Sequence, residues 1–153
     1  MTEPTTLGND LLRSAARLSR WASRHASFDV PFAQARLLAL LDELGPSRVS
    51  TLAAADHSSQ PTITTQLQRL EAAGWVHRAS DPDDARAALI SLSDEGHAAL
   101  ESVRRARLAV LSPALDQLDG AALDRVQIAI DVMNELLAAA ADDLAPHPTR
   151  KDG

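Results

Sequence analysis

The sequence predicts a mainly α-helical fold that carries one small β-hairpin. Ala and Leu are abundant, aromatic residues make up only 3% of the chain, and Tyr is absent, which favours helices over a large sheet. Apolar residues recur at helical spacing through most of the sequence. Two short β-tolerant stretches, at 75–80 and 86–92, flank the turn-forming residues 81–84 and predict the hairpin. We expect a single domain over residues 1–153.

The first two predicted helices are separated by a short connection. An amphipathic helix is expected over 5–25, with Leu7, Leu11 and Leu18 on its apolar face. Pro31 suits the first turn of the second helix, because its missing N–H is not needed there. Gly45, followed by a proline, is expected to end this helix with a left-handed cap.

A helix-turn-helix pattern follows. A short helix is expected over 49–55, capped by Ser47 or a neighbour. Residues 56–58 form the turn, and Ser59 reads as the N-cap of a fourth helix that runs to Ala73 and ends at Gly74. Helix, turn and helix followed by a hairpin is the order of a winged helix-turn-helix.

The C-terminal third is predicted to be helical. Ser93 and the two acidic residues after it suit the start of a long helix, in which Pro113 predicts a kink or an interruption. Asp119 and Gly120 are expected to cap a last helix that reaches Leu144, and the tail after it should be frayed.

Composition excludes several classes of site and protein. The chain has no cysteine, so a thiol nucleophile, a disulfide and a Cys-ligated metal are ruled out. No apolar run approaches the roughly 20 residues of a membrane span, and residues 1–4 lack the start of a secretory signal, so we expect a cytoplasmic protein. The net charge is −6, but residues 93–153 carry most of the acidic excess.

Several linked motifs resemble the multiple antibiotic resistance regulator (MarR) family. The similarity extends over about residues 7–140 and includes both flanking helical regions. Two positions depart from the family pattern: His57-Ser58 replaces a glycine and an aliphatic residue in the turn, and Ala85 replaces one wing arginine. The motifs are Ser59-Gln60-Pro61-Thr62-Ile63-Thr64, Arg69-Leu70-Glu71, Gly74, Asp81-Pro82-Asp83-Asp84-Ala85-Arg86 and Leu92-Ser93-Asp94-Glu95-Gly96.

The resemblance implies a homodimeric DNA-binding transcriptional regulator, more specifically a ligand-responsive repressor. Residues 31–92 would form the winged DNA-binding lobe, and residues 5–27 and 94–144 would form the dimerisation helices. Each subunit would present one recognition helix to one half of a pseudo-palindromic operator in double-stranded DNA. The numerous apolar positions of the terminal helices agree with this expectation, because an unpaired subunit would expose a large apolar patch.

The predicted DNA contacts lie on the fourth helix and the hairpin tip. Amide and hydroxyl side chains can read base edges in the major groove, and a helix N-terminus attracts phosphate. Arg86 would enter the minor groove, and Asp84 would hold that arginine or the turn. The candidate residues are Ser59, Gln60, Pro61, Thr62, Thr64, Thr65, Arg69, Asp84 and Arg86.

The family resemblance also implies a cleft for a small phenolic or anionic effector. Residues near the junction of the first two helices are candidates for its lining, although His25 also suits a core or interface position. Ligand binding would compete with DNA through a population shift. The candidate ligand-binding residues are Trp21, His25, Phe28, Phe32 and Arg36.

Other functions receive less support from the sequence. The five histidines are scattered without the i, i+4 spacing of paired metal ligands, so no metal or other cofactor is expected. Neither a glycine elbow around Ser58 or Ser59 nor a glycine-rich phosphate loop is present, so an enzyme is not expected. The acidic balance leaves one alternative open, a winged-helix module that binds protein without specific DNA recognition.

Overall fold

The computed structural model describes residues 3–144 and consists of six helices and a small sheet within that range. The N-terminal elements are α1 (Pro4–His25), α2 (Phe32–Leu44), β1 (Ser47–Arg48), α3 (Val49–Asp56) and α4 (Gln60–Ala72). The C-terminal elements are β2 (Val76–Asp81), β3 (Asp84–Leu92), α5 (Asp94–Leu115) and α6 (Gly120–Leu144). The predicted fold class, mainly helical with a β wing, is confirmed. The chain divides into two compact units, one ending at Leu111 and the other beginning at Ser112.

The core of the first unit lies among α2, α3, α4, β3 and the start of α5. Leu38, Leu52 and Leu67 are completely buried, and Leu100 and Val103 extend the same cluster onto α5. Complete burial of one such aliphatic side chain stabilises a fold by about 1.5–3 kcal/mol. This core fixes α4 by its inner face and leaves its outer face to solvent.

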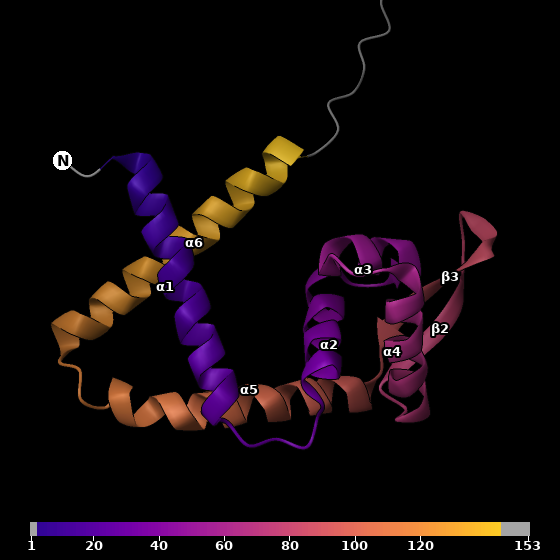
Figure 1. Cartoon of the computed structure of the whole chain (residues 1–153), viewed down its shortest axis with the longest axis horizontal. Coiled ribbons are helices and arrows are strands. Elements are labelled where there is room, and N and C mark those ends of the chain that lie inside the picture. Colours follow the sequence, from indigo (N-terminus) through magenta and orange to yellow (C-terminus); the bar gives the residue numbers. More distant parts are fainter. Residues whose placement is uncertain (1–2, 145–153) are drawn as a thin grey trace, which may run out of the picture. The chain divides into compact units, whose positions relative to one another are not determined.

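The sheet has three antiparallel strands in the order β1-β3-β2, one more than the predicted hairpin. β1 pairs through Ser47 with Ile90 of β3, and its two residues were too few to show a strand pattern. The prediction that Ser47 or a neighbour caps α3 is wrong for Ser47, because its Oγ donates to the Gly45 carbonyl at 2.9 Å. Arg48 occupies the N-cap position without a side-chain cap. Figure 1 shows the β2–β3 hairpin extending beyond α3 and α4.

The helix ends agree with most of the predicted capping residues. Gly45 ends α2 with φ +72°, and Asp119 caps α6 by accepting a hydrogen bond of 2.7 Å from the backbone N–H of Ala122. Pro31 lies at the N-cap of α2 rather than in its first turn. Pro113 does not interrupt α5, which continues for two more residues to Leu115. The predicted fraying concerns residues outside the described range.

Ser93 joins the end of β3 to the start of α5. Its side chain is 1% exposed, and its Oγ donates to the Gly74 carbonyl at 2.6 Å while accepting from the Gly96 N–H at 3.0 Å. The Ser93 N–H donates to the Trp75 carbonyl at 3.0 Å. The turn after α4, the residue before β2 and the start of α5 therefore meet at one buried serine.

The second unit contains α6, whose side chains up to Ala141 include none that is buried. Apolar residues lie around much of the helix rather than along one stripe. Its large exposed apolar residues are Leu123, Val126, Ile128, Ile130, Val132, Leu136 and Leu137.

Candidate nucleic-acid interface

The N-terminus of α4 is formed by a tight turn and a side-chain cap. His57 adopts a left-handed conformation with φ 54° and ψ 32°, which histidine tolerates better than most residues other than glycine. Ser59 then caps the helix: its Oγ accepts from the Thr62 N–H at 3.3 Å and lies 2.8 Å from the Thr62 Oγ. The remaining N–H groups of this exposed first turn suit a phosphate oxygen.

The two faces of α4 differ sharply in exposure. Ile63, Leu67 and Leu70 are at most 2% exposed and hold the helix against the core. The outer face is polar and accessible, with dimensions and chemistry that suit a DNA major groove. Its exposed residues are Gln60, Pro61, Thr62, Thr64, Thr65, Gln68 and Arg69.

Hydrogen bonds within α4 leave its polar groups unequally available. Thr65 Oγ donates to the Pro61 carbonyl at 3.0 Å, so this hydroxyl retains only acceptor capacity for a base. Gln60 has an exposed amide that offers both donors and an acceptor. Gln68, absent from the predicted contacts, lies four residues after Thr64 on the same exposed face, and this spacing was the signal that identifies it.

Arg69 is exposed and has no ion pair within residues 3–141. The nearby carboxylate of Glu71 instead accepts a hydrogen bond of 2.7 Å from Arg78 Nε, which joins α4 to β2. An arginine without a carboxylate partner is available for a phosphate or a base edge.

The hairpin tip is organised by its carboxylates. Asp81 Oδ1 accepts from the Asp83 N–H at 2.9 Å, and Asp84 Oδ1 accepts from the Arg86 N–H at 3.0 Å. Asp84 thus holds the backbone of the strand, and no ion pair to the Arg86 guanidinium occurs in the described part of the chain. Arg86 is exposed at this tip and remains available for DNA.

An electrostatic contact fastens the hairpin to the lobe. Arg48 of β1 forms an ion pair with the buried carboxylate of Asp81. Hydrogen bonding from the Asp83 N–H, with the Arg48 guanidinium, holds the pKa of the Asp81 carboxyl below its ordinary value, against the opposing effect of burial. Asp81 therefore remains ionised at neutral pH.

A cavity of about 150 Å³ lies among α1, α2 and α5. Three of the five predicted ligand-binding residues, Phe28, Phe32 and Arg36, line it, and α5 contributes Arg104 and Arg107. Trp21 and His25 lie outside its lining: their rings are 4.9 Å apart on α1, and His25 Nδ1 donates to the Trp21 carbonyl at 2.8 Å. The prediction missed the α5 arginines because only the folded chain brings α5 beside α2.

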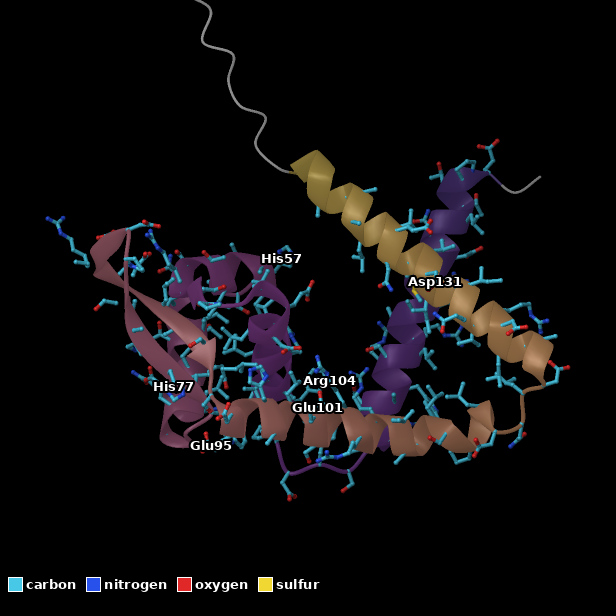
Figure 2. All side chains as sticks on the ribbon, turned by 180° about the vertical axis from the view of Figure 1, so that it is seen from behind. His57, His77, Glu95, Glu101, Arg104 and Asp131 are labelled. Atoms are coloured by element: carbon cyan, nitrogen blue, oxygen red, sulfur yellow. The ribbon has the colours of Figure 1, made fainter. Side chains whose placement is uncertain are left out.

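The two α5 arginines of the cavity have different partners. Arg104 donates to Asp42 and to Glu101, each at 2.7 Å, and Figure 2 shows Arg104 and Glu101 beside each other on α5. These two bonds raise the pKa of Arg104. Arg107 donates to Ser19 Oγ at 2.8 Å, while its buried Nε has no partner among the described residues. The cavity therefore presents an unused N–H donor.

The described residues contain no group of three or more His, Cys, Asp or Glu side chains arranged to hold a metal ion. No helix among them is both long and apolar enough to cross a membrane.

Comparison with known proteins identifies relatives of this architecture. The MarR family model matches residues 32–88. An HTH-type transcriptional regulator of Mycobacterium tuberculosis is 32% identical over 132 residues, which cover 86% of this chain and 92% of the relative.

Solved structures show the same fold over nearly the whole chain. A transcriptional regulator from Thermotoga maritima superposes with a TM-score of 0.68 at 22% identity, covering 93% of this chain and 99% of that one. A MarR family protein from Bacillus stearothermophilus gives a TM-score of 0.69 at 21% identity, covering 90% and 99%. With an exposed helix-turn-helix and wing, this protein is a DNA-binding transcription regulator rather than an enzyme, and it belongs to the MarR family.

Proposed function

We propose that this chain acts as a homodimeric repressor that binds a pseudo-palindromic operator and releases it when a small aromatic anion binds. The observation that carries the DNA-binding mode is the exposed, capped face of α4 together with an unpaired Arg86 at the wing. The proposed base and phosphate contacts are Ser59, Gln60, Pro61, Thr62, Thr64, Thr65, Arg69 and Arg86, with Asp84 supporting the wing turn and Gln68 added from its exposure.

The exposed apolar residues of α6 support the homodimer. Leu137 is 67% exposed and Ile128 is 60% exposed, and apolar residues lie on both sides of this helix. A monomer rarely presents so continuous an apolar surface to water. A second copy would cover it, and twofold symmetry would present two recognition helices to half-sites about 34 Å apart.

The cavity supports the effector. Its volume of about 150 Å³ matches a space that holds one benzene-sized ring. Phe28 and Phe32 provide aromatic surface, while Arg36 and Arg107 provide cations and N–H donors. An aromatic ring with one carboxylate or phenolate satisfies both kinds of lining.

The proposed place of action is the cytoplasm, because a regulator must reach the chromosome.

Titration against DNA from the region upstream of the protein's own gene tests this proposal. Fluorescence anisotropy over roughly 50–200 mM salt should show affinity that falls steeply with salt, because arginines displace counterions from phosphates. A scrambled duplex of the same composition is the control and should bind much more weakly. Equal affinity for both duplexes, or binding that salt does not weaken, would contradict specific operator recognition and favour a protein-binding module.

A further inference from the structure

Arg36 contacts the helix-turn-helix as well as the cavity. Its Nη2 donates to the carboxylate of Asp56, the last residue of α3, and to the Asp56 carbonyl at 3.3 Å. The same side chain lines the cavity that contains Phe28 and Phe32. It also lines a second, smaller cavity together with Asp56 and Ser58. Arg36 therefore stands between the proposed effector site and the turn that precedes α4.

Asp56 binds the turn with its second carboxylate oxygen. Oδ2 accepts a hydrogen bond from Ser58 Oγ, while Oδ1 holds Arg36. The Asp56 side chain is only 14% exposed, whereas that of Arg36 is 54% exposed. Because Ser58 directly precedes the N-cap of α4, the chain Arg36–Asp56–Ser58 connects α2 to the start of the recognition helix.

Arg36 is the cavity cation whose engagement would alter this turn. Arg104 is already held by Asp42 and Glu101, which lie away from the turn on α2 and α5. Arg107 donates to Ser19 on α1 and keeps an unpartnered Nε. An anion in the cavity can therefore bind Arg107 and Arg36. Of these two arginines, only Arg36 contacts the helix-turn-helix, through Asp56 at the end of α3.

We propose that Asp56 is a positioning residue for α4 and that Arg36 couples it to the cavity. This inference rests on the proposed effector site. An aryl carboxylate beside Arg36 makes two carboxylates share one guanidinium, which weakens the hold of Arg36 on Asp56. The turn at Ser58 then gains freedom that DNA binding must remove, so the bound anion lowers DNA affinity. Linkage requires DNA to weaken anion binding by the same factor.

The test uses benzoate as the probe, with benzamide as its neutral isostere, on the full-length protein. For the wild type, benzoate should weaken operator binding by about 5- to 150-fold, the usual range of such coupling. Benzamide should have little effect, because it adds no negative charge beside Arg36.

Asp56→Asn should reproduce the benzoate-bound behaviour without benzoate. Its operator affinity should fall towards that of the saturated wild type, and added benzoate should then change it by less than about twofold. Calorimetry should show that benzoate binds Asp56→Asn at least as tightly as it binds the wild type, because Arg36 is released from its partner. A merely structural loss would not preserve or strengthen benzoate binding.

Asp42→Asn is the matched control. It removes one negative charge beside another cavity arginine, Arg104, which keeps its bond to Glu101, and it leaves the contacts of Asp56 in place. Basal operator affinity and benzoate coupling should both remain near the wild-type values. Ser58→Ala, which removes only the hydroxyl donor, should lower operator affinity in the same direction as Asp56→Asn.

Amide hydrogen exchange gives a readout that does not depend on activity. Exchange at residues 57–60 should accelerate in Asp56→Asn and in the benzoate-bound wild type, but not in Asp42→Asn. Unchanged exchange and operator affinity in both Asp56→Asn and Ser58→Ala would refute the positioning role. Failure of benzoate to bind, or undiminished coupling in Asp56→Asn, would refute the role of Arg36. Specific DNA binding by the wild type would survive either result, whereas its absence would overturn the proposed function itself.

Discussion

Arg48 Nε donates a hydrogen bond of 2.5 Å to the carboxylate of Asp81, across 33 residues of sequence. The contact fastens the end of β2 to β1 and hence to the lobe that carries the recognition helix. Asp81 also organises the two-residue turn by accepting from the Asp83 N–H. One carboxylate therefore fixes both the shape and the attachment of the wing.

Asp81→Asn should lower the free energy of unfolding at neutral pH. The variant should also lose the part of that free energy that the wild type loses on acidification. Because the folded pKa of Asp81 lies below its ordinary value, its ionised form stabilises the fold above that ordinary value. The contribution is lost as the pH falls through the folded pKa. Urea unfolding should show a constant difference between wild type and variant above about pH 5, which shrinks below about pH 4. A difference that grows on acidification would contradict this assignment.

Arg86→Ala should weaken operator binding and reduce the slope of log affinity against log salt by about one unit. The reason is the loss of one arginine near the DNA backbone, which displaces about one counterion. Arg105→Ala, on the exposed surface of α5, removes the same charge away from the wing and α4. Anisotropy titrations at several salt concentrations should show an unchanged slope for that control. Equal slopes for the wild type and Arg86→Ala would place Arg86 outside the interface.

Gln60→Ala should relax the base preference at one operator position, at a cost of about 1–3 kcal/mol if the lost contact is bidentate. Selection from a randomised duplex pool measures that preference position by position. Gln68→Ala should act at a different position, because Gln68 lies about two turns further along the same exposed face. Gln117→Ala, beyond α5, is the control and should leave the profile unchanged. An unaltered profile for Gln60→Ala would remove Gln60 from base recognition.

Gly96→Ala should destabilise the lobe by about 1–3 kcal/mol or more, the usual cost of overpacking. A Cβ at this position would lie 2.0 Å from the Trp75 carbonyl oxygen, and backbone cannot move aside cheaply. Gly8→Ala is the opposite case, because a Cβ there meets nothing within 4 Å and alanine is the better helix former by about 1 kcal/mol. Thermal unfolding should therefore shift downward for Gly96→Ala and slightly upward for Gly8→Ala. Equal behaviour of the two variants would contradict the close approach of Gly96 to the Trp75 carbonyl.

Ile130→Glu should convert the proposed dimer into a monomer at micromolar concentration. Ile130 is 42% exposed on α6, and a charge there would have to be buried by an apolar interface. Sedimentation equilibrium gives the mass, and operator affinity should fall with it because each monomer reaches one half-site. Gln127→Ala, which removes an exposed side chain one turn earlier and its bond to Asp131 but adds no charge, is the control. A wild type that sediments as a monomer would refute the dimer directly.

The sequence predicted those features that depend on neighbouring residues. The cap at Ser59, the turn at His57 and the hairpin around Pro82 follow from local conformational preferences, and the structure confirms them. Local chemistry also predicted the cap at Ser93, although not its bond to the Gly74 carbonyl. Such features are visible because their causes lie within a few residues of each other.

Contacts between distant segments could not be predicted in the same way. β1 is two residues long and exists only because β3 lies beside it, and the Arg48–Asp81 pair joins separate strands. The cavity lining shows the same limit. Nearness to the junction of the first two helices grouped Trp21 and His25 with Phe28, whereas packing brings Arg104 and Arg107 of α5 to the cavity instead. Neighbours in three dimensions are set by the tertiary fold, which nearness in sequence does not specify.

The buried side chain of Ser93 fixes the direction in which α5 leaves the turn after α4. From Asp94 to Leu111 the helix spans roughly 26 Å, so a difference of about 5° in that direction would place the far end about 2 Å away. Leu100 and Val103 pack into the same core as α4, so one serine side chain and this packing together set the course of the longest helix of the first unit that follows the wing.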